Sequence, residues 1–143
     1  MYVSAFDLSE EATDHLKSWA EKENLSIEIK LADMLNLPYD DNSFDAIFVY
    51  HVISHTDSIG IKRIINEMTR VLRIDGEIFI TLCSKESWSF KKAGYPKLDE
   101  NTIIKTKEGP EKGIPHFYVN LDDILDLLVN YNIESIRHIE ECY

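Results

Sequence analysis

Few residues in this sequence can build covalent or metal-bound frameworks. Only two of the 143 residues are cysteines, Cys83 and Cys142. Two thiols are too few for a disulfide framework or a four-thiolate zinc site. Glycine is also scarce, and no two of the five glycines lie within three residues of each other. The sequence therefore contains neither the glycine motif of dinucleotide-binding proteins nor a phosphate-binding loop of the Walker type.

Basic residues and long apolar runs are scarce as well. The 15 Lys and Arg residues against 26 Asp and Glu residues give a formal net charge of −11. This balance argues against binding to nucleic acid or to an anionic membrane. No apolar run approaches the roughly 20 residues that span a bilayer, and residues 1–7 lack the pattern of a signal peptide. We therefore expect a cytoplasmic protein with no nucleic-acid or membrane partner.

The patterning that is present predicts a single α/β domain over residues 1–143. A chain of this length can bury roughly 70% of its unfolded surface. A strand–helix–strand order occurs twice, which favours a parallel sheet with helices between its strands. The six segments are a strand at 2–6, a helix at 9–23, a strand at 27–33, a strand at 44–50, a helix at 58–72 and a strand at 77–82.

The chain after residue 84 is less regular. We expect a hairpin that pairs residues 102–105 with residues 116–119, and then a helix capped by Asn120. Isoleucines at 133, 136 and 139 predict a closing strand. The expected organisation is a core at 1–84, a variable excursion at 85–115, and a C-terminal hairpin, helix and strand at 116–143.

Two acidic side chains stand where predicted strands end. Asp7 follows the first strand and Asp33 follows the second. In open α/β sheets, ligands bind beyond the carboxyl ends of the strands, where a carboxylate can accept both hydroxyls of a ribose. Asp7 is a candidate for that role, and Asp33 for accepting a hydrogen bond from an exocyclic amine such as that of adenine. The alternatives are that Asp7 shares in capping the next helix and that Asp33 is a solvated turn residue.

Two histidines follow the central strand at a spacing of four residues. On a helix, His51 and His55 would share one face and could hold a metal ion. No Glu lies between them in the metalloprotease pattern and no third ligand is evident, so we expect no metal site and favour a metal-dependent hydrolase least. Either histidine could instead act as a general base or line a pocket. Cys83 has no nucleophile motif, and we expect a buried, unreactive thiol.

Five short motifs follow one another over residues 3–84. They are AFDLSEE at 5–11, LADMLNLP at 31–38, DDNSFDAI at 40–47, YHVISH at 50–55 and EMTRVLRIDGE at 67–77. In this order and spacing the motifs resemble those of the class I S-adenosylmethionine-dependent methyltransferases, especially the small-molecule "type 11" group.

The resemblance implies S-adenosylmethionine as the cofactor and methyl transfer to a small-molecule acceptor as the reaction. It also implies that the enzyme acts mainly by aligning the cofactor's methyl group with the acceptor. A base is needed only where the acceptor must lose a proton. His55 is the candidate for that base or for a substrate contact. The implied cofactor-binding residues are Asp7 and Leu8 at the ribose, Asp33 and Met34 at the adenine, and Tyr50 and His51 at the methionine end.

The resemblance is incomplete at the start of the sequence. In the family, a first strand and a turn with the pattern Asp/Glu-x-Gly-x-Gly-x-Gly precede the ribose-binding strand, whereas this sequence begins at that second strand. We therefore expect a Rossmann-like methyltransferase sheet that is reduced, with its first strand absent and helices on both faces. Three outcomes are open. The two strands on either side of the missing one pair directly, a second copy of the chain covers the gap in a homodimer, or the sequence is a fragment of a longer protein. The alternative function is an inactive methyltransferase-derived module that acts through self-association or protein binding.

Overall fold

The first half of the α/β domain begins with a strand–helix–strand unit. The computed structural model describes residues 1–140. Strand β1 (Ser4–Asp7) pairs in parallel with β2 (Glu28–Leu31), and helix α1 (Glu10–Lys22) connects them. Ser9 caps α1 by accepting a hydrogen bond from the backbone N–H of Ala12, as its position in the sequence predicted.

A second unit of the same kind follows. Strand β3 (Phe44–Val49) pairs in parallel with β4 (Leu72–Ile80), and helix α2 (Ser58–Val71) connects them. The predicted helix buries one apolar stripe, which consists of Ile61, Ile64, Ile65, Met68 and Val71. All of these except Val71 pack with Ile53, Phe117 and Val119 into the main hydrophobic cluster.

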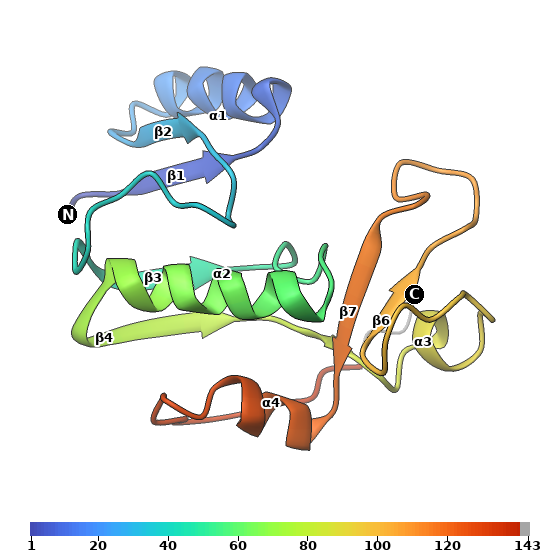
Figure 1. The fold of residues 1–143 in the computed structure, drawn as a ribbon. Helices are drawn as coiled ribbons and strands as arrows, with labels where there is room; N and C mark the ends of the chain where they lie inside the picture. Colours follow the sequence, from blue (N-terminus) through green and yellow to red (C-terminus); the bar gives the residue numbers. More distant parts are fainter. Residues whose placement is uncertain (141–143) are drawn as a thin grey trace.

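The two strand pairs do not join into one hydrogen-bonded sheet. Over residues 1–140, β1 bonds only to β2 and β3 bonds only to β4, so the direct pairing of β1 with β3 that we considered is not formed. The four strands point the same way, and β1 lies apart from β3 (Figure 1). The Tyr39 ring bridges the two pairs, with ring centroids 4.8 Å from Phe44 and 6.3 Å from Phe6.

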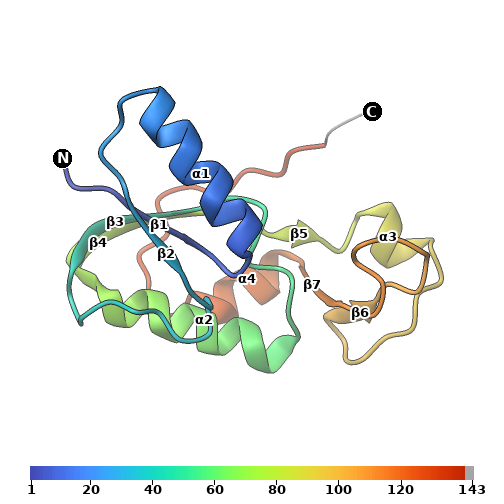
Figure 2. The ribbon, with the colours of Figure 1, turned by 90° about the horizontal axis from the view of Figure 1, so that it is seen from above.

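Helices cover the strands from two sides. The strands run between α1 on one side and α2 on the other (Figure 2), as the reduced Rossmann-like prediction requires. The outer surface of β3 and β4 remains open, because Phe48 is 73% exposed and Phe79 is 52% exposed. A run such as 44–50, apolar except for Asp45, is typical of a strand covered on both faces. This expectation is wrong for β3, because the face that carries Phe48 is open to solvent.

The remaining elements form a small three-stranded sheet beside the main core. Strand β5 (Cys83–Ser84) pairs with β7 (Pro115–Val119), which also pairs with β6 (Thr102–Ile104) in the predicted hairpin. The short helix α3 (Trp88–Lys91) precedes β6. Helix α4 (Leu121–Leu127) follows β7 and begins with a capping box of Asn120 and Asp123. Cys83 is free and half-buried, and Cys142 lies outside the described residues.

Two sequence expectations about strands are wrong. Helix α2 ends at Val71, within one residue of the predicted end, but β4 begins at Leu72 rather than at residue 77. Asp75 adopts a φ of 65° inside β4, where the pairing with β3 is irregular. No strand forms over residues 132–140. Isoleucines three residues apart do not alternate between two faces of a strand, and Ile139 is 73% exposed.

Within residues 1–140, no helix is both long enough and apolar enough to cross a membrane.

Candidate functional site

The two predicted acids lie on neighbouring strands at the same edge of the β1–β2 pair. Asp7 is the last residue of β1 and stands opposite Leu31 in the register. The ladder continues one step further, since the Ala32 N–H donates to the Asp7 carbonyl at 2.9 Å. Asp33 follows directly. The structure therefore brings both carboxylates to the carboxyl edge, where α/β sheets bind ligands.

Both carboxylates are held in the same way. Asp7 Oδ1 accepts a hydrogen bond from the Ser9 N–H at 2.8 Å, and Asp33 Oδ1 accepts one from the Leu35 N–H at 2.8 Å. Each bond orients the side chain through the backbone two residues later. Both side chains are exposed, so the second oxygen of each remains accessible to a ligand. The alternative roles, a helix cap for Asp7 and a turn residue for Asp33, correspond to these same two hydrogen bonds. Each bond uses only Oδ1, so either role is compatible with ligand binding through Oδ2.

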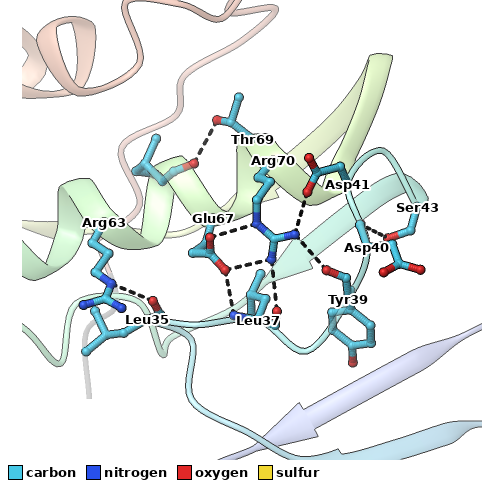
Figure 3. A network of polar contacts seen from close by, with 11 residues as sticks. Leu35, Leu37, Tyr39, Asp40, Asp41, Ser43, Arg63, Glu67, Thr69 and Arg70 are labelled. Atoms are coloured by element: carbon cyan, nitrogen blue, oxygen red, sulfur yellow. Dashed lines mark hydrogen bonds and ion pairs between the residues drawn. The ribbon is translucent and has the colours of Figure 1, made fainter.

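The loop that follows Asp33 is clamped onto α2. Arg70 donates to the carbonyls of Leu37 and Tyr39 at 3.0 and 2.8 Å, and Glu67 accepts from the Leu37 N–H at 2.8 Å (Figure 3). Arg63 adds a bond from its Nε to the Leu35 carbonyl at 2.8 Å. These hydrogen bonds pair backbone groups of the loop with side chains of α2 and thereby fix the conformation of the loop after β2.

Other predicted cofactor residues have mixed surroundings. Tyr50 and His51 follow β3 with their rings 4.0 Å apart, and Tyr50 is 53% exposed. His51 adopts a φ of 55°, and its N–H donates to Thr81 Oγ1 at 2.8 Å. Leu8 is 71% exposed. Met34 is half-buried and packs against the hydrophobic cluster.

His55 lies in a different cluster from His51. Residues 51–55 form no helix, so the spacing of four places no two imidazoles on a common helical face. His55 Nε2 instead lies 3.5 Å from Glu111 Oε1, and His116 Nε2 lies 3.5 Å from the same oxygen. The histidine rings are 4.8 Å apart between centroids. One carboxylate oxygen thus faces two imidazole nitrogens.

The surroundings of this cluster shift the pKa values of two members. Partial burial, together with the nearby His116, lowers the pKa of the His55 imidazole. The hydrogen bond from Lys105 lowers the pKa of the Glu111 carboxyl. Both shifts favour a neutral His55 beside an ionised Glu111 at neutral pH.

Sequence reasoning missed Glu111 and His116 as functional candidates. They lie 56 and 61 residues beyond His55 in the sequence, in the β6–β7 loop and in β7. The contact depends on the docking of β7 beside the His55 loop, where the Phe117 N–H donates to the Ser54 carbonyl at 2.8 Å. No local motif carries a signal for it.

Comparison with known protein families identifies the fold. The profile of the methyltransferase domain family matches residues 1–80, more than half of the 143 residues. This chain belongs to the methyltransferase domain family. Membership confirms the resemblance predicted from the sequence motifs and implies S-adenosylmethionine as the cofactor.

Curated relatives of this methyltransferase-family chain match only part of it. The sterol 24-C-methyltransferase ERG6B of Gibberella zeae is 31% identical over 77 residues, which are 52% of this chain and 20% of the relative. An uncharacterised protein of Methanocaldococcus jannaschii is 30% identical over 56 residues, which are 39% of this chain and 24% of that protein. The chain therefore spans about a quarter or less of the length of these relatives.

Solved structures share the fold over most of this methyltransferase-family chain. The PH0226 protein of Pyrococcus horikoshii has a TM-score of 0.77 at 18% identity, covering 98% of this chain and 67% of that one. An S-adenosylmethionine-dependent methyltransferase of Methanosarcina mazei has a TM-score of 0.72 at 20% identity, covering 90% and 68%. The [4+2]-cyclase SpnF has a TM-score of 0.64 at 20% identity, covering 91% and 41%. A fold shared with a cyclase does not by itself assign a reaction.

Proposed function

We propose that this chain binds S-adenosylmethionine across the carboxyl ends of β1, β2 and β3 and transfers its methyl group to a small molecule. The observation that carries the proposal is the pair of carboxylates on adjacent strands, Asp7 and Asp33, each fixed by a backbone N–H at 2.8 Å. Family membership over residues 1–80 supports the choice of cofactor.

The proposed roles follow from what each exposed group can accept. The outer carboxylate oxygen of Asp7 binds the two ribose hydroxyls, beside Leu8. The outer carboxylate oxygen of Asp33 accepts a hydrogen bond from the exocyclic amine of adenine, beside Met34. Tyr50 and His51 follow β3, and their rings, with centroids 4.0 Å apart, line the methionine end of the cofactor.

The chemistry of this proposal asks little of the protein beyond alignment. Bound S-adenosylmethionine supplies an electrophilic methyl group on a sulfonium. The chain's own residues hold the cofactor, orient the acceptor and exclude water from the approach between them. His55 is the residue we assign to an acceptor that must lose a proton, since its lowered pKa keeps the imidazole neutral.

Titration calorimetry tests the cofactor site directly. We expect the folded chain to bind S-adenosylmethionine and S-adenosylhomocysteine, and Asp7→Ala to weaken both by at least about tenfold, since a hydrogen bond to a charged group contributes about 1.5–3 kcal/mol. The matched control is Asp14→Ala, which removes an exposed carboxylate on α1 that pairs with Lys17. No binding by the folded chain, or equal binding by both variants, contradicts the proposal.

We also propose self-association through the open surface of β3 and β4, with a second copy of the chain as the partner. Phe48 stacks on Phe79 with centroids 4.9 Å apart and an interplanar angle of 9°, and Tyr50 extends the stack at 6.2 Å from Phe48. All three rings are more than half exposed. An apolar aromatic surface beside an unpaired strand edge favours association. This observation also favours the second candidate function, an inactive module that works by self-association.

Sedimentation velocity distinguishes the two states. We expect the wild-type chain to form a homodimer and Phe48→Glu to shift it to the monomer. Ile59→Glu is the matched control, because Ile59 is 81% exposed on α2, away from the aromatic stack. A monomeric wild type, or a dimer that survives Phe48→Glu, contradicts the proposal.

We further propose a cytoplasmic location for the chain. The presence of only two cysteines among 143 residues supports a protein that does not depend on an oxidising compartment. Cell fractionation with an antibody against the chain tests this, and recovery in a membrane or secreted fraction contradicts it.

A further inference from the structure

Three potential metal ligands from separate segments converge beside β7. His55 comes from the loop after β3, Glu111 from the loop between β6 and β7, and His116 from β7 itself. One donor atom from each lies within 4.8 Å of the other two. The Phe117 N–H donates to the Ser54 carbonyl and docks the loop after β3 onto β7, so the backbone holds His55 beside His116.

His116 is oriented as a metal ligand is. Its ring is 2% exposed, and Nδ1 donates to the Ile114 carbonyl at 2.9 Å. A donating Nδ1 leaves the lone pair of a neutral ring on Nε2. That nitrogen is buried and has no hydrogen-bond partner among the described residues. A buried acceptor without a partner destabilises the fold. A bound metal ion would accept the lone pair of Nε2 and remove this cost.

The spacing fits an ion better than it fits hydrogen bonds. A metal with bonds of 2.0–2.2 Å to nitrogen and oxygen, in tetrahedral geometry, holds its ligand atoms about 3.4 Å apart. Both nitrogen-to-oxygen distances are 3.5 Å. A charge-assisted hydrogen bond would be about 2.7–2.9 Å long.

The carboxylate is positioned to offer one oxygen to this centre. Lys105 binds Glu111 Oε2 and leaves Oε1 facing the two histidines. Such an outer contact orients a ligand, as is usual around metal sites. Lys105 and Glu111 also border a hollow of about 240 Å³, which leaves room for water or a small ligand. The positive charge of Lys105 lowers the affinity for a cation, so we expect micromolar rather than nanomolar binding.

We propose that His55, Glu111 and His116 form a binding site for a divalent metal ion of the zinc class. Two imidazoles and one carboxylate suit borderline ions such as Zn²⁺ and Co²⁺, and three protein ligands leave a position open. The ion ties the loop after β3 to β7 and to the loop before it. The site does not require bound S-adenosylmethionine. An ion on His55 Nε2 would take up the lone pair that the proposed base role uses, so His55 serves one role or the other.

Cobalt and zinc binding to the metal-free chain tests the site without cofactor. We expect one Zn²⁺ per chain by calorimetry, and visible absorption bands of four-coordinate Co²⁺ that Zn²⁺ removes. His55 is exposed and Glu111 is half-buried, so His55→Ala and Glu111→Gln remove ligands without opening the core. Each should weaken binding by at least about 100-fold, because loss of an outer contact alone costs about 10- to 100-fold. The matched controls are His51→Ala and Glu108→Gln, which lie outside the cluster.

The outcomes separate the site from adventitious binding. Loss in His55→Ala and Glu111→Gln but not in the controls supports the proposal. Absence of a cobalt signal, or equal affinity in all variants, overturns it. A further readout is thermal stability, because an ion that binds only the folded chain raises the Tm of wild type and leaves that of His55→Ala unchanged. Since no step uses S-adenosylmethionine, failure here leaves the proposed function untouched.

Discussion

Glu67 and Arg70 form a two-bond ion pair on the face of α2 that meets the loop after β2. Arg70 Nε donates to Glu67 Oε1 and Arg70 Nη2 donates to Glu67 Oε2, both at 2.9 Å (Figure 3). The same guanidinium also binds Asp41 Oδ1 at 2.8 Å. A planar fork that matches a carboxylate and two carbonyls is a property of Arg rather than Lys. The pair therefore positions the loop that carries Asp33.

Replacing the guanidinium by an ammonium tests this positioning. We expect Arg70→Lys to lower the free energy of unfolding more than Arg73→Lys does, because the part-buried carbonyls of Leu37 and Tyr39 lose donors that an ammonium cannot replace together. Arg73→Lys is the control, since Arg73 and Asp45 are 56% and 82% exposed at their side chains and an exposed pair contributes at most about 1 kcal/mol. Urea unfolding measures both, and equal losses contradict the assignment.

The same pair predicts a dependence of stability on pH. Hydrogen bonds from Arg70 lower the pKa of the Glu67 carboxyl from its ordinary value of 4.5. A group whose pKa falls on folding contributes stability above its unfolded pKa, and loses that contribution as the pH falls through its folded pKa. We expect Glu67→Gln to be less stable than wild type at pH 7 and the difference to shrink below about pH 4.5. A difference that stays constant down to pH 2 contradicts this origin.

Local patterns predicted the helices well because their signals lie within a few residues. The stripe of α2 and the caps at Ser9 and Asn120 each depend on spacings of three or four positions. The motifs predicted the carboxyl-edge positions of Asp7 and Asp33 for the same reason.

Expectations that depended on distant partners fared worse. Phe48 follows the pattern of a covered central strand, but its exposure is decided by what packs over that face of β3, which no nearby residue encodes. The spacing of His51 and His55 left open a shared helical face, whereas the neighbours of His55 in the structure are Glu111 and His116. Contacts formed by docking of β7 have no local sequence signal.

The core beneath α2 gives a prediction that depends on packing alone. Ile61 is fully buried at 0% exposure, whereas Ile59, two residues earlier on the same helix, is 81% exposed. We expect Ile61→Ala to lower the free energy of unfolding by about 2–5 kcal/mol, because removed methyl groups leave a cavity. Ile59→Ala should change it by less than about 0.5 kcal/mol. Denaturant unfolding of both variants provides the comparison, and similar values would contradict the packing described.

The assignment of Asp33 to the adenine amine can be tested by changing the ligand as well as the protein. The inosyl analogue of S-adenosylhomocysteine carries a carbonyl where adenine carries its exocyclic amine. If Asp33 accepts a hydrogen bond from that amine, the wild-type chain should prefer the adenosyl compound by about 10- to 100-fold, since charged hydrogen bonds contribute about 1.5–3 kcal/mol.

The variant Asp33→Ala should bind both compounds with nearly equal affinity, because the discriminating carboxylate is gone. Asp40→Ala is the control, since Asp40 is an exposed carboxylate on the same loop and its removal should preserve the preference. Competition calorimetry with the two ligands gives the four affinities of a double-mutant cycle. A preference that persists in Asp33→Ala would place adenine recognition on another residue, whereas loss of binding to both ligands alike would indicate that Asp33 shapes the loop through its bond to the Leu35 N–H rather than contacting the base.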